Sequence, residues 1–434
     1  MLGLIVVLAT PIVALRNGVG LTPAMGWSAK NLGCSVTEQI VREVADSLVS
    51  SGLADLGYVY LDIGGCWQAK RDTKGFILED TTLFPSGITV LAEYLNSKGL
   101  KLGLTSSAST QTCNGKLGGL YYENQDAQSY AKWNVDFVKY NNCNVEGVSD
   151  KSDSLQRYGA LRDALNATNK RINYAISSNG ENGIWEFGAD LGNSWRTTDG
   201  IRDSWESVVE IMSQNVNLAK YAAPGGFNDM DMLQVGNGGM TDEEYRAHFS
   251  IWAALKSPLF LSHDITKLTR TTMDIIGNEE VTAINQDPLG KSAYLRAVLQ
   301  NIFVWVGELA NGERLLMVVN NNDKPVSLDI GIGILGSNIP ITAVVQIRDL
   351  WQKKDLGLFA GTIRLTSIPP HGSRMLRVTK RKGDFPPLST SSLDNDLLNL
   401  SDAGLSFIPL AVVLTFAIGM SWVRSRRQGY VQLT

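Results

Sequence analysis

Three segments carry the side chains best suited to chemistry. They read Asp-Phe-Val-Lys-Tyr-Asn-Asn-Cys over 136–143, Trp-Arg-Thr-Thr-Asp-Gly over 195–200 and Phe-Asn-Asp-Met-Asp-Met over 227–232. A carboxylate in such a segment can attack a carbon centre and leave again, or donate a proton to a departing oxygen. Asn141 is the critical residue of the first segment, because its neutral amide is a far poorer nucleophile than a carboxylate.

Short apolar runs alternate with amphipathic stretches between residues 20 and 290, and this alternation predicts how the three segments are positioned. Strands are expected at Tyr58–Ile63, Leu100–Leu104 and Phe137–Tyr140. Helices are expected at Thr37–Ser51, Gly87–Lys98, Ala127–Trp133 and Ser154–Leu165. Repeated strand–helix units indicate a parallel sheet. At this length we favour a closed (β/α)8 barrel, with a doubly wound open sheet as the alternative.

A second, smaller domain is predicted at residues 291–379. After Pro288–Gly290 the strands expected are short, β-prone and separated by turn residues, at Asn301–Val306, Arg314–Val319, Ile341–Gln346 and Ser373–Val378. This pattern is typical of an antiparallel β-sandwich. Residues 380–404 are rich in Ser, Pro, Asp, Leu and Asn, which indicates a linker.

The composition is that of an ordinary globular protein. The 434 residues suffice for two folded units, with 44% hydrophobic and 19% charged residues. A formal net charge of −4 gives no electrostatic case for nucleic-acid binding. The three histidines are scattered and no CxxC pair occurs, so neither a metal nor another cofactor is expected.

The N-terminus is predicted to be a signal peptide spanning residues 1–18. Its apolar stretch is too short to span a bilayer comfortably, and cleavage is expected between Ala14 and Gly20. A buried first strand is the alternative.

The C-terminus is predicted to anchor the chain in a membrane. Residues 405–423 carry no charge and are long enough for a transmembrane helix. Arg424 and two further arginines follow directly, which favours a single-pass type I protein of the secretory pathway, with the barrel outside or luminal and a cytoplasmic tail at 424–434. A glycolipid-anchor signal is the alternative, although such a tail should end apolar. Tyr430–Leu433 has the form of a tyrosine-based sorting signal.

An exported domain with four cysteines favours disulfides over free thiols. The four residues are Cys34, Cys66, Cys113 and Cys143, and three pairings are open in principle. Asn166 and Asn399 lie in N-glycosylation sequons, which fits the same compartment.

Motifs from Leu21 to Val378 resemble glycoside hydrolase family 27, the α-galactosidases and α-N-acetylgalactosaminidases. They are Leu21–Trp27, Lys98–Gly103, Lys139–Tyr140, Asn193–Arg196, Pro224–Leu233, His248–Trp252, Lys256–Pro258 and Asn285–Gly290. The resemblance implies a catalytic barrel followed by a β-sandwich, a galactoside-like carbohydrate ligand and a homodimer. It also implies disulfides Cys34–Cys66 and Cys113–Cys143. The implied chemistry is retaining hydrolysis, in which one carboxylate attacks the anomeric carbon and another protonates the leaving oxygen.

The same resemblance places both catalytic carboxylate positions on residues without a carboxylate. The nucleophile position falls on Asn141 and the acid/base position on Gly200. Asp199 can substitute as the acid only if its loop shifts by one residue, and the segment Asp203–Trp205, which keeps the family register, argues against a shift.

The implied sugar-binding positions are partly lost and partly kept. A pair of aspartates that grips galactose hydroxyls is replaced by Gly64 and Gly65, and another sugar-contacting motif becomes Ser177–Asn179. The positions that match the family are Trp27, Trp67, Lys139, Arg196, Asp229, Asp231 and Met232. For the two tryptophans and Met232, lining of the core at the barrel mouth is the alternative role, and for Asp229 it is capping of a turn.

These losses predict a catalytically impaired homologue that acts as a carbohydrate-binding or interaction module. The alternative is an active retaining α-galactosidase-type enzyme with relocated carboxylates, with Asp199 or Asp203 as the acid and Asp62 or Asp229 as the second carboxylate. A purely structural surface protein with a collapsed pocket is the third possibility.

Overall fold

The computed structural model describes residues 17–145 and 150–381. The predicted membrane helix 405–423, the tail 424–434, Asn399 and nearly all of the signal peptide and linker lie outside these residues. Within the described ranges, no helix is long and apolar enough to cross a membrane. Asn17 is already part of the folded unit, since its side-chain amide donates to the Ile172 carbonyl and to Asn193 Oδ1, both at 2.9 Å.

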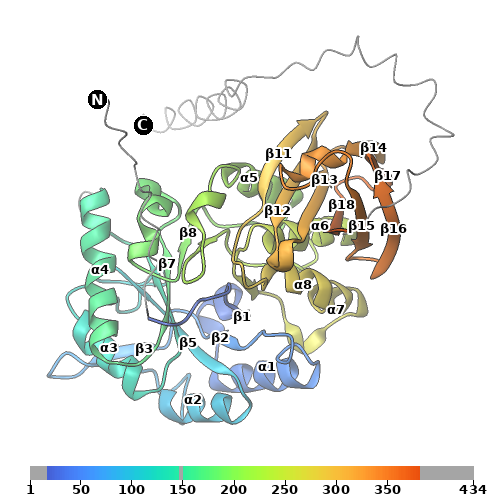
Figure 1. The fold of residues 1–434 in the computed structure, drawn as a ribbon. Coiled ribbons are helices and arrows are strands. Elements are labelled where there is room, and N and C mark those ends of the chain that lie inside the picture. Colours follow the sequence, from blue (N-terminus) through green and yellow to red (C-terminus); the bar gives the residue numbers. More distant parts are fainter. Residues whose placement is uncertain (1–16, 146–149, 382–434) are drawn as a thin grey trace, which may run out of the picture. The chain divides into compact units, whose positions relative to one another are not determined.

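A parallel sheet of eight strands forms the first domain (Figure 1). In sheet order the strands are β10 (Leu259–Leu261), β1 (Met25–Ser28), β2 (Tyr60–Asp62), β5 (Lys101–Ser107), β6 (Phe137–Asn141), β7 (Asn173–Ser177), β8 (Ser194–Arg196) and β9 (Phe227–Asp229). The two edges meet, because Leu233 just beyond β9 bridges Leu261, and its N–H donates to the Phe260 carbonyl at 2.9 Å. The sheet is therefore closed, as predicted, and the open doubly wound alternative is wrong.

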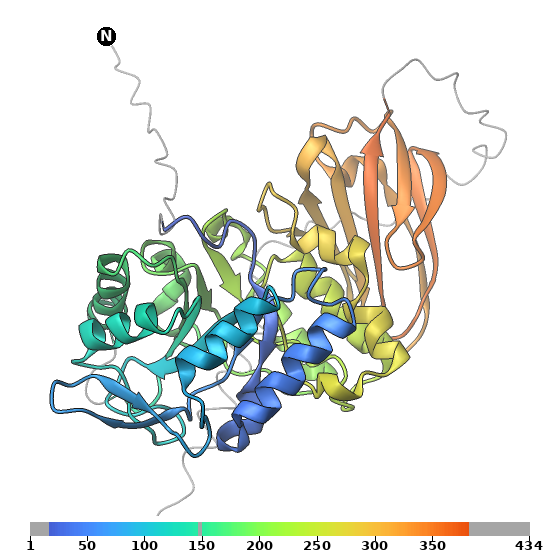
Figure 2. The same ribbon diagram turned by 90° about the horizontal axis from the view of Figure 1, so that it is seen from below.

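Helices cover the outside of this barrel (Figures 1 and 2). They are α1 (Glu38–Ser50), α2 (Ile88–Ser97), α3 (Glu123–Lys132), α4 (Lys151–Ala167), α5 (Trp205–Gln214), α6 (Asp242–Ala254), α7 (Arg270–Ile276) and α8 (Glu279–Asn285). In α1 the buried residues Val41, Val44, Ala45 and Leu48 recur with helical spacing on one face. Thr37 caps this helix by accepting the Ile40 N–H.

The second domain has a six-stranded antiparallel sheet facing a two-stranded one. The larger sheet orders β11 (Tyr294–Leu299), β12 (Ile302–Glu308), β13 (Arg314–Asn320), β18 (Ser373–Lys380), β15 (Val344–Asp349) and β16 (Lys354–Ala360), and the smaller pairs β14 (Val326–Gly331) with β17 (Thr362–Ile368). The four strands expected from the sequence correspond to β12, β13, β15 and β18. The sequence analysis missed the others; β11 and β16 are largely exposed edge strands that lack a buried apolar run.

Side chains from both domains meet at His371, in the turn between β17 and β18. Its ring stacks on Trp205 with 5.1 Å between ring centroids, and its Nδ1 lies 2.7 Å from the Glu244 carboxylate. Trp205 Nε1 also donates to Asn321 Oδ1 at 2.9 Å. The sandwich is thus fixed against the entries of α5 and α6, on the part of the barrel that follows β8 and β9.

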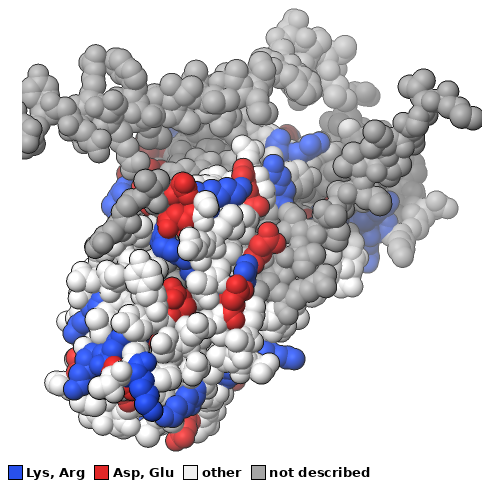
Figure 3. All heavy atoms as spheres, turned by 90° about the vertical axis from the view of Figure 1, so that its left-hand side faces the viewer, with Lys and Arg blue, Asp and Glu red and all other residues white. Residues whose placement is uncertain are grey.

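The face shown in Figure 3 carries basic and acidic side chains interspersed among a large uncharged area. No continuous basic surface is visible on its described part.

Candidate functional site

The carboxyl ends of the barrel strands bring the three chemistry-bearing segments together. In the sheet register Asn141 at the end of β6 pairs with Ser177 at the end of β7, and Arg196 at the end of β8 pairs with Asp229 at the end of β9. In barrels of this type the carboxyl ends of the strands and the loops that follow them form the functional face. The predicted site residues Asn141, Arg196 and Asp229 therefore share one end of the barrel.

Asp231 is the electrostatic centre of this end. Its side chain is fully buried, and Lys30 Nζ lies 2.7 Å and Arg196 Nη2 2.9 Å from its Oδ2. The Ile201 N–H donates to the same oxygen at 3.0 Å. Burial alone would raise the pKa of Asp231, but the charges of Arg196, Lys30 and Lys139 outweigh burial and hold the pKa well below its usual range. The carboxyl group is therefore an ionised anchor rather than a proton donor.

Lys30 is a site residue that sequence reasoning missed. It lies in the short 3-10 segment Ala29–Ser35 directly after β1, and no motif of catalytic type surrounds it. The signal that could have found it is its position, since residues after barrel strands face the functional end. Asp231 itself has a backbone φ of 72°, a left-handed conformation that non-glycine residues adopt only when their contacts hold them there.

Gly200, the predicted acid/base position, lies beside this ion cluster. A Cβ atom at Gly200 would be 3.3 Å from Arg196 Nη2 and 3.7 Å from Asp231 Oδ2. The hydrogen bond from Ile201 to Asp231 fixes the loop at the next residue. Asp199 is exposed on the same loop.

The Asp203 carboxylate holds two loops together through hydrogen bonds. Its Oδ2 accepts the Gly239 N–H at 2.6 Å, and the Tyr245 hydroxyl lies 2.9 Å from its Oδ1 and 3.0 Å from its Oδ2. These contacts join the loop before α5 to the entry of α6. They weaken the alternative in which Asp203 serves as the acid.

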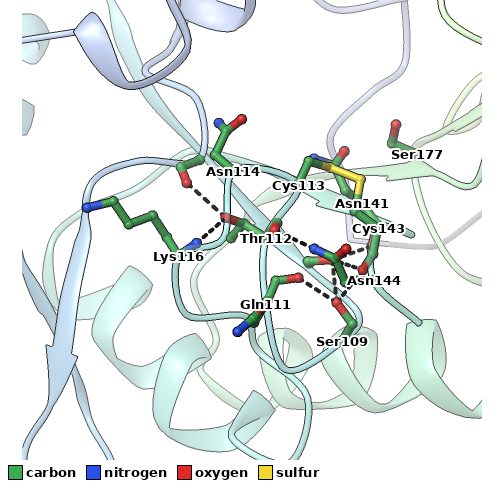
Figure 4. Close-up of a disulfide and its surroundings, with 12 residues drawn as sticks. Ser109, Gln111, Thr112, Cys113, Asn114, Lys116, Asn141, Cys143, Asn144 and Ser177 are labelled. Carbon is green, nitrogen blue, oxygen red and sulfur yellow. Dashed lines mark hydrogen bonds between the residues drawn. A yellow bond between two sulfur atoms is a disulfide. The ribbon is translucent and has the colours of Figure 1, made fainter. Parts of the chain in front are cut away.

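Asn141 lies against a disulfide that ties two loops of the mouth together (Figure 4). The bond joins Cys113, after β5, to Cys143, after β6, and the Asn141 amide nitrogen is 3.4 Å from Cys113 Sγ. Asn144 Nδ2 donates to the Thr112 carbonyl at 2.8 Å across the same two loops. The second disulfide joins Cys34 to Cys66, so the pairing implied by the family resemblance is confirmed.

Removing the disulfide beside Asn141 tests how much it stabilises this end of the barrel. The double variant Cys113→Ser, Cys143→Ser opens a crosslink spanning 30 residues, and we expect the free energy of unfolding to fall by about 3–4 kcal/mol from the entropy of the freed loop. Urea unfolding under non-reducing conditions measures the change. A loss below about 1 kcal/mol would show that the crosslink hardly constrains the unfolded chain.

Asp62 at the end of β2 and the glycines at positions 64 and 65 shape the neighbouring part of the mouth, beside β5. The Asp62 carboxylate accepts the hydroxyls of Ser28 at 2.8 Å and Thr105 at 2.9 Å, and the Gly64 N–H at 3.0 Å. Gly64 has a φ of 77°, which favours glycine. At Gly65 an added Cβ would meet only ordinary contacts, the nearest being Thr105 Cγ2 at 3.5 Å.

A narrow pocket lies among the barrel strands, and Asn141, Arg196 and Gly200 are not among its walls. Its walls are Ser28, Asp62, Phe137, Lys139, Ala175, Ser194, Asp229, Asp231, Met232, Pro258 and Phe260. It brings together four of the predicted binding residues, namely Lys139, Asp229, Asp231 and Met232. Asp229 Oδ1 accepts the Asp231 N–H at 2.8 Å, which supports the turn-capping role considered for it.

The two predicted tryptophan contacts are buried instead. Trp67 has no exposed surface, and its Nε1 donates to the Thr105 carbonyl at 3.0 Å. Trp27 is 3% exposed and its Nε1 donates to the His263 carbonyl at 3.0 Å. Each indole ring is buried, and its N–H group already has a hydrogen-bond acceptor within the protein. The geometry therefore favours a role in lining the core over direct contact with a sugar.

The fold and this mouth define a barrel–sandwich protein of glycoside hydrolase type, and comparison with known proteins gives the family. The family model described as "Alpha galactosidase A" matches residues 22–287, and that of the "Alpha galactosidase C-terminal beta sandwich domain" matches residues 300–378. The chain is 44% identical over 347 residues to "Alpha-galactosidase 3" of Arabidopsis thaliana, covering 79% of this chain and 78% of the relative.

Solved structures agree. α-Galactosidase I from Mortierella vinacea superposes with a TM-score of 0.81 at 38% identity, covering 84% of this chain and 98% of that one. An α-galactosidase from Saccharomyces cerevisiae, solved with raffinose, gives a TM-score of 0.80 at 28% identity, with coverages of 84% and 99%. This chain belongs to the α-galactosidase family, which confirms the resemblance seen in its motifs.

Proposed function

We propose that this α-galactosidase homologue binds carbohydrate at the barrel mouth and no longer hydrolyses α-galactosides efficiently. The observation that carries the proposal is the pair Asn141 and Gly200, at the two positions predicted for the catalytic carboxylates. Retaining hydrolysis needs a carboxylate nucleophile for the covalent intermediate and a second carboxyl group for proton transfer. Loss of acid–base assistance alone lowers the rate by about 10²–10⁴-fold.

The carboxylates that remain are poor replacements. A general acid needs a pKa raised toward the working pH, whereas the pKa of Asp231 is held low by Arg196 and Lys30 after their charges overcome its burial. Asp62 accepts three hydrogen bonds from neutral donors, and Asp203 is bound to the α6 entry. Asp199 remains as the candidate acid and Asp229 as the candidate second carboxylate for the alternative function, an active enzyme with relocated carboxylates.

Hydrolysis of an aryl α-galactoside by the full-length protein tests the proposal, with "Alpha-galactosidase 3" of Arabidopsis thaliana assayed alongside. We expect kcat/KM at least about 10⁴-fold below that of the relative, because nucleophile and acid are both absent. Turnover within about tenfold of the relative would establish the alternative and overturn the proposal. Binding of saccharides without turnover separates a carbohydrate-binding module from a purely structural protein.

We also propose that the chain passes through the secretory pathway as a single-pass type I membrane protein that forms homodimers. Its two disulfides suit an oxidising compartment, and Asn166 is exposed near the end of α4. An N-glycan on Asn166, detected as a mass loss after glycosidase treatment of protein from a eukaryotic host, is the expected result. An unglycosylated chain retained in the cytosol would contradict this placement.

A further inference from the structure

The barrel mouth retains three cationic side chains around Asp231. Lys30 and Arg196 both form ion pairs with this one carboxylate. Lys139, one of the pocket walls, makes no hydrogen bond or ion pair with any described residue, although its charge acts on Asp231. Desolvation lowers the pKa of Lys30, and repulsion from Arg196 and Lys139 lowers it further against the attraction of Asp231. Three cationic side chains therefore surround one carboxylate, which forms ion pairs with two of them.

Two other carboxylates line the pocket, and neither pairs with these cations. Asp62 accepts hydrogen bonds from Ser28, Thr105 and the Gly64 N–H, and Asp229 accepts the Asp231 N–H. Neither forms an ion pair with a described lysine or arginine within 4.0 Å. A site with carboxylates also at 64, 65, 141 and 200 would hold a large excess of negative charge, whereas this one holds as many cations as anions.

Arg196 has an unused donor. The residue is 5% exposed, and its Nε finds no hydrogen-bond partner among the described residues, while Nη1 reaches only Ser177 Oγ at 3.3 Å. A buried donor without a partner destabilises the fold, and an acceptor on a ligand would remove that cost. Gly200, which is exposed beside this guanidinium, places no carboxylate of its own against it, although a Cβ there would lie only 3.3 Å from Arg196 Nη2.

We propose that the saccharide bound at this mouth carries an anionic group, a carboxylate or a sulfate ester, held by Arg196 and Lys139 beside the uncharged residues Asn141 and Gly200. Its charge takes the place of the carboxylates that these positions lack. A planar guanidinium binds such oxyanions through charge-assisted hydrogen bonds, and the lysine ammonium adds a second charge. This inference rests on the proposed non-hydrolytic binding function and specifies its ligand class.

Calorimetry of the full-length protein tests this ligand class with three probes: methyl α-galactoside, methyl α-galacturonide and galactose 6-sulfate. At least one anionic probe is expected to bind about tenfold or more tightly than the neutral one, and its affinity should fall as salt rises from about 0.05 to 0.5 M. The uronide and the sulfate, compared with each other, show which oxyanion the site prefers.

Lys139→Met is the diagnostic variant and Lys132→Met its matched control. Lys132 is an exposed lysine in the last turn of α3, on the chain segment that leads into the opposite, amino-terminal end of β6. Lys139→Met should weaken binding of the preferred anionic probe about tenfold more than it weakens binding of methyl α-galactoside, while the control changes neither. Should Lys139→Met fail to fold, the salt dependence of the unmodified protein decides, because it needs no variant.

The outcomes separate this inference from the function on which it rests. Equal or tighter binding of the neutral galactoside, without turnover, overturns the anionic ligand and leaves the proposed function standing. Hydrolysis of the galactoside at the rate of the Arabidopsis relative overturns the proposed function. Absence of binding by all three probes overturns both.

Discussion

The double variant Asn141→Asp, Gly200→Asp is expected to hydrolyse an aryl α-galactoside less than about tenfold faster than the unmodified protein. One reason is the missing sugar grip at Gly64 and Gly65, without which the substrate is not oriented for attack. The other is local charge: a side chain at position 200 begins about 3.3 Å from Arg196 Nη2, and such a neighbour favours the ionised form of a carboxyl group. A general acid is thereby kept deprotonated. The measurement is kcat/KM at neutral pH.

Asn142→Asp is the control for the first of the two substitutions, because it adds one negative charge one residue away, where the side chain accepts from Arg157 at 2.8 Å and its amide contacts the Glu181 carboxylate. Adding Gly65→Asp to the double variant should raise activity further, since an added Cβ there meets only ordinary contacts. Gly64→Asp is less suitable, because its φ of 77° costs roughly 1–2 kcal/mol for a residue with a Cβ. Full recovery of family-level activity by the double variant alone would show that the two glycines are not where the sugar is gripped.

Asp231→Ala is expected to lower the free energy of unfolding by about 3–5 kcal/mol at pH 7. The variant leaves the buried Arg196 and the ammonium of Lys30 without their shared counter-charge, and uncompensated buried charges destabilise by this amount. Urea unfolding measures the loss. Asp329→Ala is the control: its ion pair with Arg364 is largely exposed, so the expected loss is below about 1 kcal/mol.

The difference in the free energy of unfolding between the unmodified protein and Asp231→Ala should depend on pH, and the direction of that dependence follows from the pKa of Asp231. Because the folded protein holds the pKa of Asp231 below its unfolded value of about 3.9, the stabilisation is complete above that value and is lost as pH falls below it. The stability gap between the unmodified protein and Asp231→Ala should therefore be constant from pH 5 to 7 and narrow below about pH 4. A gap that widens on acidification would mean that Asp231 is protonated in the folded state.

The sequence predicted the parts of the fold whose signals are local. β2, β5 and β6 are buried apolar runs, and α1 and α2 have regular apolar faces, so all five were found near their observed bounds. Strands β8 and β9 have three residues each, which is too few to show the alternation of apolar and polar residues typical of a strand. Their segments were identified only through the family motifs. The β3–β4 hairpin, Gln68–Arg71 with Ile77–Glu79, is mostly exposed or half-buried and gave no signal.

Site residues that lie in family motifs were predicted from the sequence. A site residue that is recognised only by its contacts in the folded protein was missed. Asn141, Arg196 and Asp231 lie in recognisable segments. Lys30 contacts Asp231 across 201 positions of sequence, and nothing in its own surroundings shows this pairing. The sequence also could not predict that Trp67 is buried, because an aromatic side chain beside a site can line either the pocket or the core.

Intact-mass spectrometry after incubation with an activated 2-deoxy-2-fluoro-α-galactoside tests the central claim, the absence of a catalytic nucleophile, most directly. Retaining hydrolysis passes through a covalent glycosyl-enzyme, which accumulates when fluorine slows its hydrolysis while the activated leaving group keeps its formation faster. We predict no mass change for this protein, while the Arabidopsis relative gains one fluorogalactosyl group. A gain of that mass here, mapped by peptide analysis to Asp62, Asp229 or any other carboxylate, would contradict the loss of the nucleophile.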